Sequence, residues 1–262
     1  MQAEVSRLDL RLRRRSLLGY SLGMAAYAFI IVALYPAFRD SASLNALTRN
    51  GNAVAALFGA TGSLTSPAGW LNANIYQNFL PLIVLLATIG YGASAIAGQD
   101  EDGVLSLTAA LPVSRRAILA QKALTLVVQA VVVAVATMIL VLAGRGFQLS
   151  VSTTHLTGIT IGVALLGIDF GLLALAIGAA TGRRGTALGV TSAIAAASYL
   201  ISSLAPVVNW IRPARYASLF YWAVGNQQLS SGLSAGAAAT LVVTGVILLA
   251  AAIAAFRRLD LR

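Results

Sequence analysis

The chain has 262 residues, of which 58% are hydrophobic and only 10% are charged, and its mean hydropathy is +0.84. A soluble domain carries about a quarter charged residues, so this composition excludes a water-exposed globule and indicates an integral membrane protein. The sequence has no cysteine, which excludes disulfides, thiolate metal sites and cysteine nucleophiles. We attribute the net charge of +10 to the ends of membrane helices rather than to nucleic-acid binding.

Residues 1–15 form a basic segment in which five arginines alternate with leucine and valine. We predict an amphipathic helix that lies at the membrane interface and leads into the first span. A basic tail that only fixes the topology would explain the same residues, so both interpretations stay open.

Six apolar stretches are each long enough to cross a bilayer, which requires about 20 residues. The sequence therefore predicts an all-α integral membrane fold, with a single transmembrane domain over residues 1–262. The predicted spans are residues 17–36, 75–97, 117–142, 156–180, 186–204 and 235–256. Glycine pairs four residues apart in the fourth span permit close helix packing, but with 24 glycines in the chain such spacings are expected by chance.

Two longer connections separate the spans. Residues 36–75 are polar and rich in serine, asparagine and glycine, and residues 205–234 combine several aromatic residues with two prolines. Pro206 and Pro213 interrupt any continuous helix in the second connection. We predict short re-entrant helices there, which dip into the outer leaflet before the sixth span.

The distribution of basic residues predicts the orientation of the chain. With both termini in the cytoplasm, thirteen of the eighteen lysines and arginines fall in inner segments. The five that fall in outer segments are Arg39, Arg49, Arg145, Arg212 and Arg215. Because inner loops carry an excess of basic residues, this bias places the segment between the second and third spans in the cytoplasm.

That segment, residues 99–115, carries the strongest functional signal, and we call it the docking segment. Its acids would favour the positive end of a helix dipole, and the leucines that follow would give a short helix an apolar face. Pro112 would end this helix, and Ser114 would cap the next one. A capped turn between two spans is the simpler alternative. The residues predicted to contact a partner are Asp100, Glu101, Asp102, Gly103, Leu105, Leu107, Leu111, Pro112, Ser114 and Arg115.

The docking segment resembles the loop between the second and third spans of ABC-2-type exporter permeases. In that family two acids, any residue, Gly, Thr and Leu precede a Leu-x-x-Pro-x-Ser-Arg run. Val104 stands where the family has Thr, and residues 108–110 are smaller than the usual leucine-rich run. The likeness covers the whole chain, including the Gly-Arg-Arg turn at 182–184, the stretch 213–221 and the ending Phe-Arg-Arg-Leu-Asp-Leu.

The resemblance implies a permease subunit of an ATP-driven exporter in a bacterial plasma membrane. In the family the loop is a coupling helix that docks on a separate ATPase subunit, and the N-terminal segment is an elbow helix. Two ATPase subunits would hold the ATP and magnesium, so no cofactor is expected in this chain. A second permease, identical or related, would complete the pathway.

The apolar spans suggest the substrate class, and the exporter hypothesis suggests an external gate. A hydrophobic or amphipathic substrate is expected, such as a drug, a lipid or a peptide, which includes multidrug efflux. The outer aromatic segment would form the gate. Its predicted residues are Trp210, Tyr216, Phe220 and Tyr221.

The sequence contains no P-loop, no metal-ligand cluster and no paired carboxylates within a span, so we predict no catalytic site. Asp169 lies near the middle of the fourth span, where an acid is costly unless it is paired or hydrated. It either lines the transport path or is a structural acid bonded to a neighbouring helix. Two other functions stay open, a proton-coupled secondary transporter that uses Asp169 and a membrane scaffold that transports nothing.

Overall fold

The computed structural model describes residues 4–41, 63–103, 114–225 and 228–258. In these ranges the chain is helical and contains no strand, which confirms the all-α fold. Six helical runs of the described residues are long and apolar enough to cross a membrane. Their bounds are Arg14–Phe38, Pro67–Glu101, Arg115–Phe147, Thr153–Thr181, Arg184–Leu204 and Ala235–Arg258.

These runs are built from long helices and shorter segments. The N-terminal helix α1 spans Glu4–Leu12 and precedes the first long helix. The long helices are α2 (Arg14–Phe38), α6 (Phe79–Ala93), α9 (Arg115–Ala143), α10 (Thr153–Thr181), α11 (Arg184–Leu204) and α13 (Ala235–Arg258). The short helical segments are α5 (Pro67–Leu71), η1 (Asn72–Tyr76), η2 (Ser94–Gly98), α7 (Gln99–Glu101), η3 (Gly144–Phe147), η4 (Arg212–Ala217), η5 (Tyr221–Gly225) and α12 (Gln228–Ser231).

The second run begins eight residues before the predicted boundary at 75, and the reason is local. Ser66 caps α5 by accepting a hydrogen bond from the N–H of Gly69 at 3.1 Å, and Pro67 stands at the first helical position, where its missing N–H costs nothing. The asparagines of this stretch are typical of a loop, but here their side chains form hydrogen bonds with the preceding helical turn. Asn74 and Asn78 donate to backbone carbonyls, each at 2.9 Å.

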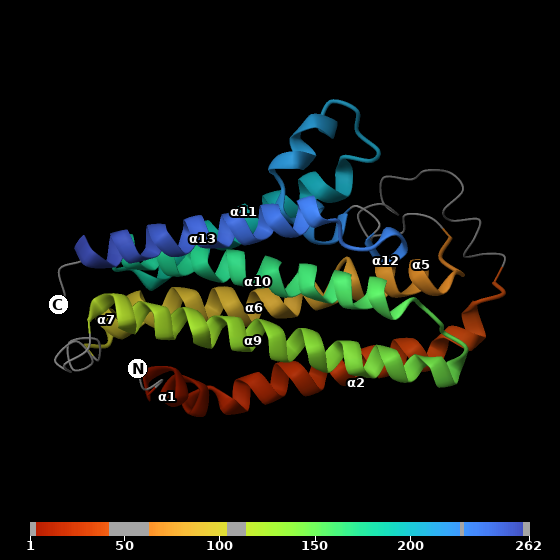
Figure 1. Ribbon diagram of the computed structural model, residues 1–262, viewed down its shortest axis with the longest axis horizontal. Helices are drawn as coiled ribbons and strands as arrows, with labels where there is room; N and C mark the ends of the chain where they lie inside the picture. Colours follow the sequence, from red (N-terminus) through yellow and green to blue (C-terminus); the bar gives the residue numbers. More distant parts are fainter. Residues whose placement is uncertain (1–3, 42–62, 104–113, 226–227, 259–262) are drawn as a thin grey trace.

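Helix α10 lies at the centre of the bundle and contacts α6, α9, α11 and α13. Figure 1 shows it between α13 and the pair α6 and α9, with α2 on the far side of α9. Glycines of both helices permit this position, because a Cβ at Gly92 of α6 would lie 2.2 Å from the carbonyl oxygen of Gly171, and a Cβ at Gly167 of α10 would lie 2.3 Å from Cγ1 of Val84. The two helices therefore approach backbone to backbone, so a glycine spacing that sequence alone left uninformative is used for packing.

The outer faces of the bundle are apolar. Large hydrophobic side chains are exposed on α2, α11 and α13, among them Leu22, Ile194, Val246 and Ile247. A water-soluble protein rarely exposes so much contiguous apolar surface. These faces therefore suit contact with lipid or with other membrane helices.

Candidate functional site

The two flanks of the docking segment lie at the same end of the bundle as α1 and the last turns of α13 (Figure 1). Ser114 is the N-cap of α9, as predicted, and its Oγ accepts a hydrogen bond from the N–H of Ala117 at 3.3 Å. On the other flank Gly103 has a φ of +71°, which glycine adopts without steric cost. The predicted contact residues Leu105, Leu107, Leu111 and Pro112 lie outside the described residues.

The three acids at the start of the segment differ in exposure. Asp100 is only 5% exposed, so its side chain faces the protein interior. Glu101 and Asp102 are exposed. The Oε1 atom of Glu101 accepts a hydrogen bond from the backbone N–H of Arg184 at 2.9 Å, which joins α7 to the first turn of α11. An approaching protein would therefore meet Glu101 and Asp102 before Asp100.

Arg115 connects the other flank to the C-terminal helix. Its Nη1 donates to the backbone carbonyl of Phe256 at 3.2 Å, and its guanidinium lies 5.8 Å from the centre of the Phe256 ring. Together, Glu101 and Arg115 link the flanks of the docking segment to α11 and α13. Any movement of the segment would act on both helices.

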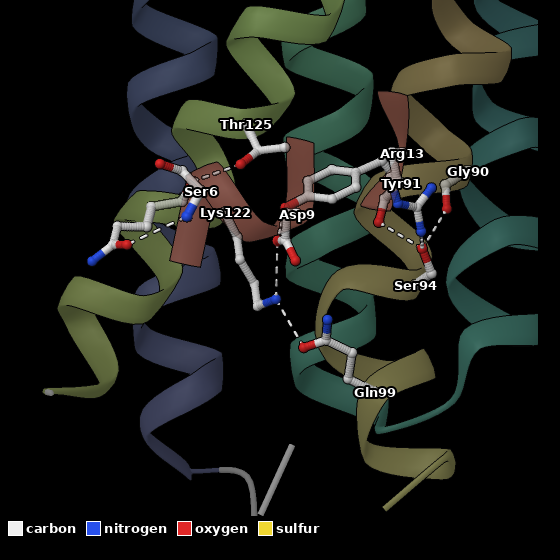
Figure 2. Close-up of polar contacts among 10 residues, drawn as sticks. Ser6, Asp9, Arg13, Gly90, Tyr91, Ser94, Gln99, Lys122 and Thr125 are labelled. Carbon is white, nitrogen blue, oxygen red and sulfur yellow. Dashed lines mark hydrogen bonds and ion pairs between the residues drawn. The ribbon is translucent and has the colours of Figure 1, made fainter. Parts of the chain in front are cut away.

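A polar network lies just inside this end of the bundle and is shown in Figure 2. Asp9 of α1 accepts hydrogen bonds from Tyr91 of α6, at 2.6 Å, and from Lys122 of α9, at 3.3 Å. Lys122 also donates to Gln99, the first residue of α7, at 2.8 Å. All three of Asp9, Tyr91 and Lys122 are less than a tenth exposed. The network joins α1, α6, α7 and α9 through buried polar atoms.

The sequence prediction did not include this network. Lys122 is one of the thirteen basic residues that it assigned to inner segments, but Lys122 lies two turns inside α9 and is 1% exposed. The available signal was that this lysine, the single one in the chain, stands within the predicted third span, residues 117–142. A buried lysine requires an acceptor, and no acid of its own helix can supply one, because residues 115–143 contain none.

Asp169 lies in the interior of α10 and is 1% exposed. Neither of its carboxylate oxygens has a hydrogen-bond partner among the described residues. A Cβ placed on Gly245 of α13 would lie 2.8 Å from Oδ1 of Asp169. The carboxyl group therefore occupies the space that this glycine leaves between α10 and α13.

The four predicted gate residues do not form one group. Tyr216 and Tyr221 are in edge-to-face contact, with ring centroids 5.5 Å apart, and Trp222 packs against both. Phe220 is buried and packs instead against Tyr199, at 5.4 Å. Trp210 is 81% exposed. The aromatic cluster of η4 and η5 thus contains Trp222, which the prediction omitted.

Arg215 covers this aromatic cluster. Its guanidinium lies 4.7 Å from the ring centre of Tyr216 and 5.2 Å from that of Tyr221, a cation–π arrangement. A hydrogen bond to the hydroxyl of Tyr216 raises the pKa of Arg215 above its ordinary value. The cluster therefore carries a permanent positive charge.

A cavity of about 800 Å³ lies between α6 and α11. Its walls are mainly apolar, and Leu82, Leu86 and Leu188 are about half exposed where they line it. Polar side chains are contributed by Asn74, Asn78, Ser192 and Tyr199, and the Tyr199 hydroxyl donates to Oδ1 of Asn78 at 2.6 Å. The cavity can hold an apolar group and offers it few polar contacts.

Comparison with known protein families gives one match that covers nearly the whole chain. Residues 3–261 match the family described as ABC-2 family transporter protein. A search of curated proteins found no matching relative. The family match spans all six long helical runs and both flanks of the docking segment.

Proposed function

Because the chain belongs to the ABC-2 transporter family, we propose that it is the permease subunit of an ATP-driven exporter. Members of this family are the membrane components of ABC transporters and work with ABC ATPases. The present sequence contains no P-loop, so ATP and magnesium would be held by the partner ATPase. A second permease, identical or related, would complete the pathway.

The position of the docking segment carries this proposal. Its flanks lie at one end of the bundle, and exposed acids there would meet the ATPase. Glu101 accepts a hydrogen bond from α11 and Arg115 donates one to α13, so a push on the segment would be transmitted to two membrane helices. This arrangement suits the conversion of ATPase closure into movement of the spans.

The cavity between α6 and α11 supports the proposal that the substrate is hydrophobic or amphipathic. Apolar walls favour apolar groups by removing them from water, and the hydrogen-bonded pair of Asn78 and Tyr199 would orient a small polar head. We assign the external gate to the aromatic cluster of Tyr216, Tyr221 and Trp222 rather than to the four residues first predicted.

The docking role is tested by affinity purification of the tagged chain from its own membranes. Leu107→Asp places a charge on the predicted apolar face, and Asp102→Arg reverses an exposed charge of the flank. Asp40→Arg is the matched control, because Asp40 is also exposed but lies beyond the end of α2. We expect a P-loop ATPase to be retained by wild type and by the control, and lost from both docking variants.

The outcome distinguishes the exporter from the alternatives. Retention of the ATPase by both docking variants would place its binding surface elsewhere. Absence of any ATPase from the gently solubilised wild type would contradict the exporter. In that case flux driven by a proton gradient alone would point to a secondary transporter, and absence of flux would point to a scaffold.

One observation favours the secondary transporter as the second candidate. The carboxyl group of Asp169 is buried inside a span, and its oxygens have no bonded neighbour within the described part of the chain. Buried ionisable groups in spans often carry protons. If Asp169 carried the coupling proton, Asp169→Asn would abolish gradient-driven flux, whereas an ATP-driven exporter would keep its ATP-dependent flux.

A further inference from the structure

Helix α1 buries two polar side chains against the protein and exposes two of its leucines. Ser6 and Asp9 are 3% and 7% exposed, whereas Leu8 and Leu12 are 57% and 73% exposed. Amphipathic helices of soluble proteins pack the other way, with the apolar stripe on the core. Polar contacts therefore contribute strongly to the attachment of α1 to the rest of the bundle.

The outward side of α1 suits the membrane interface. Arg7 and Arg11 are exposed beside the two leucines, and a helix with apolar and basic residues on its free surface binds at the boundary of an anionic bilayer. The helix would then be held by the bilayer on one side and by the polar network on the other.

A single carboxylate of α1 holds the two helices from which the docking segment emerges. Asp9 Oδ2 accepts from Tyr91 on α6 and from Lys122 on α9, and Lys122 in turn binds Gln99 at the beginning of the segment. Figure 2 shows Asp9 between these two side chains. Asp9 is thus bonded to both of the helices whose ends carry the segment.

Arg13, at the junction of α1 and α2, strengthens the attachment on the α6 side. Its Nη2 donates to Oγ of Ser94 at 2.5 Å, and its guanidinium lies 4.9 Å from the ring centre of Tyr91. Ser94 begins η2, a π-helical turn. Such turns are frequent at functional sites, and Arg13 ties the junction of α1 and α2 to this one.

We propose that α1 is a strap that holds the ends of α6 and α9 at the separation needed for ATPase docking, and that Asp9 is its positioning residue. This inference rests on the proposed function. The strap moves with α6 and α9 as one body. Removal of one partner from a buried ion pair leaves the other charge uncompensated. Loss of the Asp9 charge therefore releases α1 and lets the two flanks separate.

The test uses the absence of cysteine from the chain. Ser6→Cys and Gln121→Cys introduce two thiols where the backbone N–H of Ser6 donates to Oε1 of Gln121 at 3.4 Å. A short bis-methanethiosulfonate reagent then joins α1 to α9, and a reductant removes the link. The joined chain tests whether fixing α1 can replace the Asp9 contact.

ATPase retention is measured by affinity purification in wild type, Asp9→Asn, Asp9→Glu and the exposed control Asp40→Asn. We expect Asp9→Asn to lower retention about tenfold, a small part of what breaking a buried pair can cost. Asp9→Glu and Asp40→Asn retain the ATPase. The cross-link restores retention in Asp9→Asn and leaves wild type unchanged, and reduction removes the restoration.

Several outcomes would overturn the strap. One is normal ATPase retention in Asp9→Asn, and another is a cross-link that fails to restore retention in this variant. A third is loss of retention when wild type is cross-linked, because this would show that α1 must move. If Asp9→Asn does not fold, Tyr91→Phe keeps the ion pair, removes one hydrogen bond to Asp9, and should give a smaller loss that the cross-link also restores. Normal retention in Tyr91→Phe would then reject the proposal.

A readout that needs no ATPase separates this inference from the proposed function. The cross-linking yield in native membranes reports how closely α1 lies against α9, and we expect it to fall in Asp9→Asn. If the wild type binds no ATPase, but the cross-linking yield still falls in Asp9→Asn, the exporter is refuted. The attachment of α1 by Asp9 is then still supported. An unchanged yield would refute the attachment, whatever the ATPase does.

Discussion

At the scale of single residues, Asp169 is a buried acid, and both oxygens of its carboxyl group lack a hydrogen-bond partner among the described residues. Its carboxylate is buried in α10 against Gly245 of α13, and no described residue donates a hydrogen bond to it. An aspartate at the centre of a membrane helix costs about 2.5–3.5 kcal/mol on insertion scales. We therefore expect the neutral Asp169→Asn variant to unfold at a higher temperature in detergent than wild type.

Thermal unfolding of purified protein measures this effect, with Asp40→Asn as the control for loss of one exposed negative charge. A lower unfolding temperature for Asp169→Asn would show that the carboxylate has a stabilising partner in the assembled transporter. A stabilised variant without transport activity would indicate that the carboxyl group is kept for function.

At the scale of helices, the close approach of α6 and α10 depends on glycine. Gly92→Ala would place a Cβ 2.2 Å from the carbonyl oxygen of Gly171, so the two backbones must separate. We expect a loss of about 1–3 kcal/mol in the free energy of unfolding, the usual cost of overpacking. Gly90→Ala on the same helix is the matched control, because its Cβ would meet no atom within 4 Å.

Denaturant unfolding of both variants provides the comparison. Gly90→Ala should be neutral or slightly stabilising, because alanine favours helix over glycine. Equal stability of the two variants would mean that α6 can move away from α10 without a loss of free energy. This result would contradict the close packing of the two backbones at Gly92.

At the scale of the whole molecule, those basic residues predicted to be cytoplasmic that the structure describes gather at one end of the bundle (Figure 1). The turn between α10 and α11 carries Arg183 at this end, and η3 carries Arg145 at the opposite end, with both side chains exposed. If both termini are cytoplasmic, a membrane-impermeant maleimide added to intact cells will label Arg145→Cys and not Arg183→Cys.

The cysteine-free sequence removes background labelling from the chain. Permeabilised cells provide the control, in which both variants should react. Labelling of Arg183→Cys in intact cells would invert the orientation and place the docking segment outside the cell, where it could not meet an ATPase.

The sequence by itself determined the all-α membrane fold, the number of spans and the cap at Ser114. Hydropathy and capping are local properties, because each depends on residues close together in the chain. The family resemblance rested on such a local pattern, and the family match over residues 3–261 bears it out. The docking role of residues 99–115 stays a prediction, since four of its predicted contacts lie outside the described residues.

Tertiary structure alone decided which polar residues are buried together. Asp9 and Lys122 are 113 positions apart, and neither position shows that α1 crosses α6 and α9 with its polar side inward. The cavity between α6 and α11 and the separation of Phe220 from the aromatic cluster have the same origin. Burial and pairing depend on which surfaces meet after the helices pack, and hydropathy of one segment contains no information about the segment opposite.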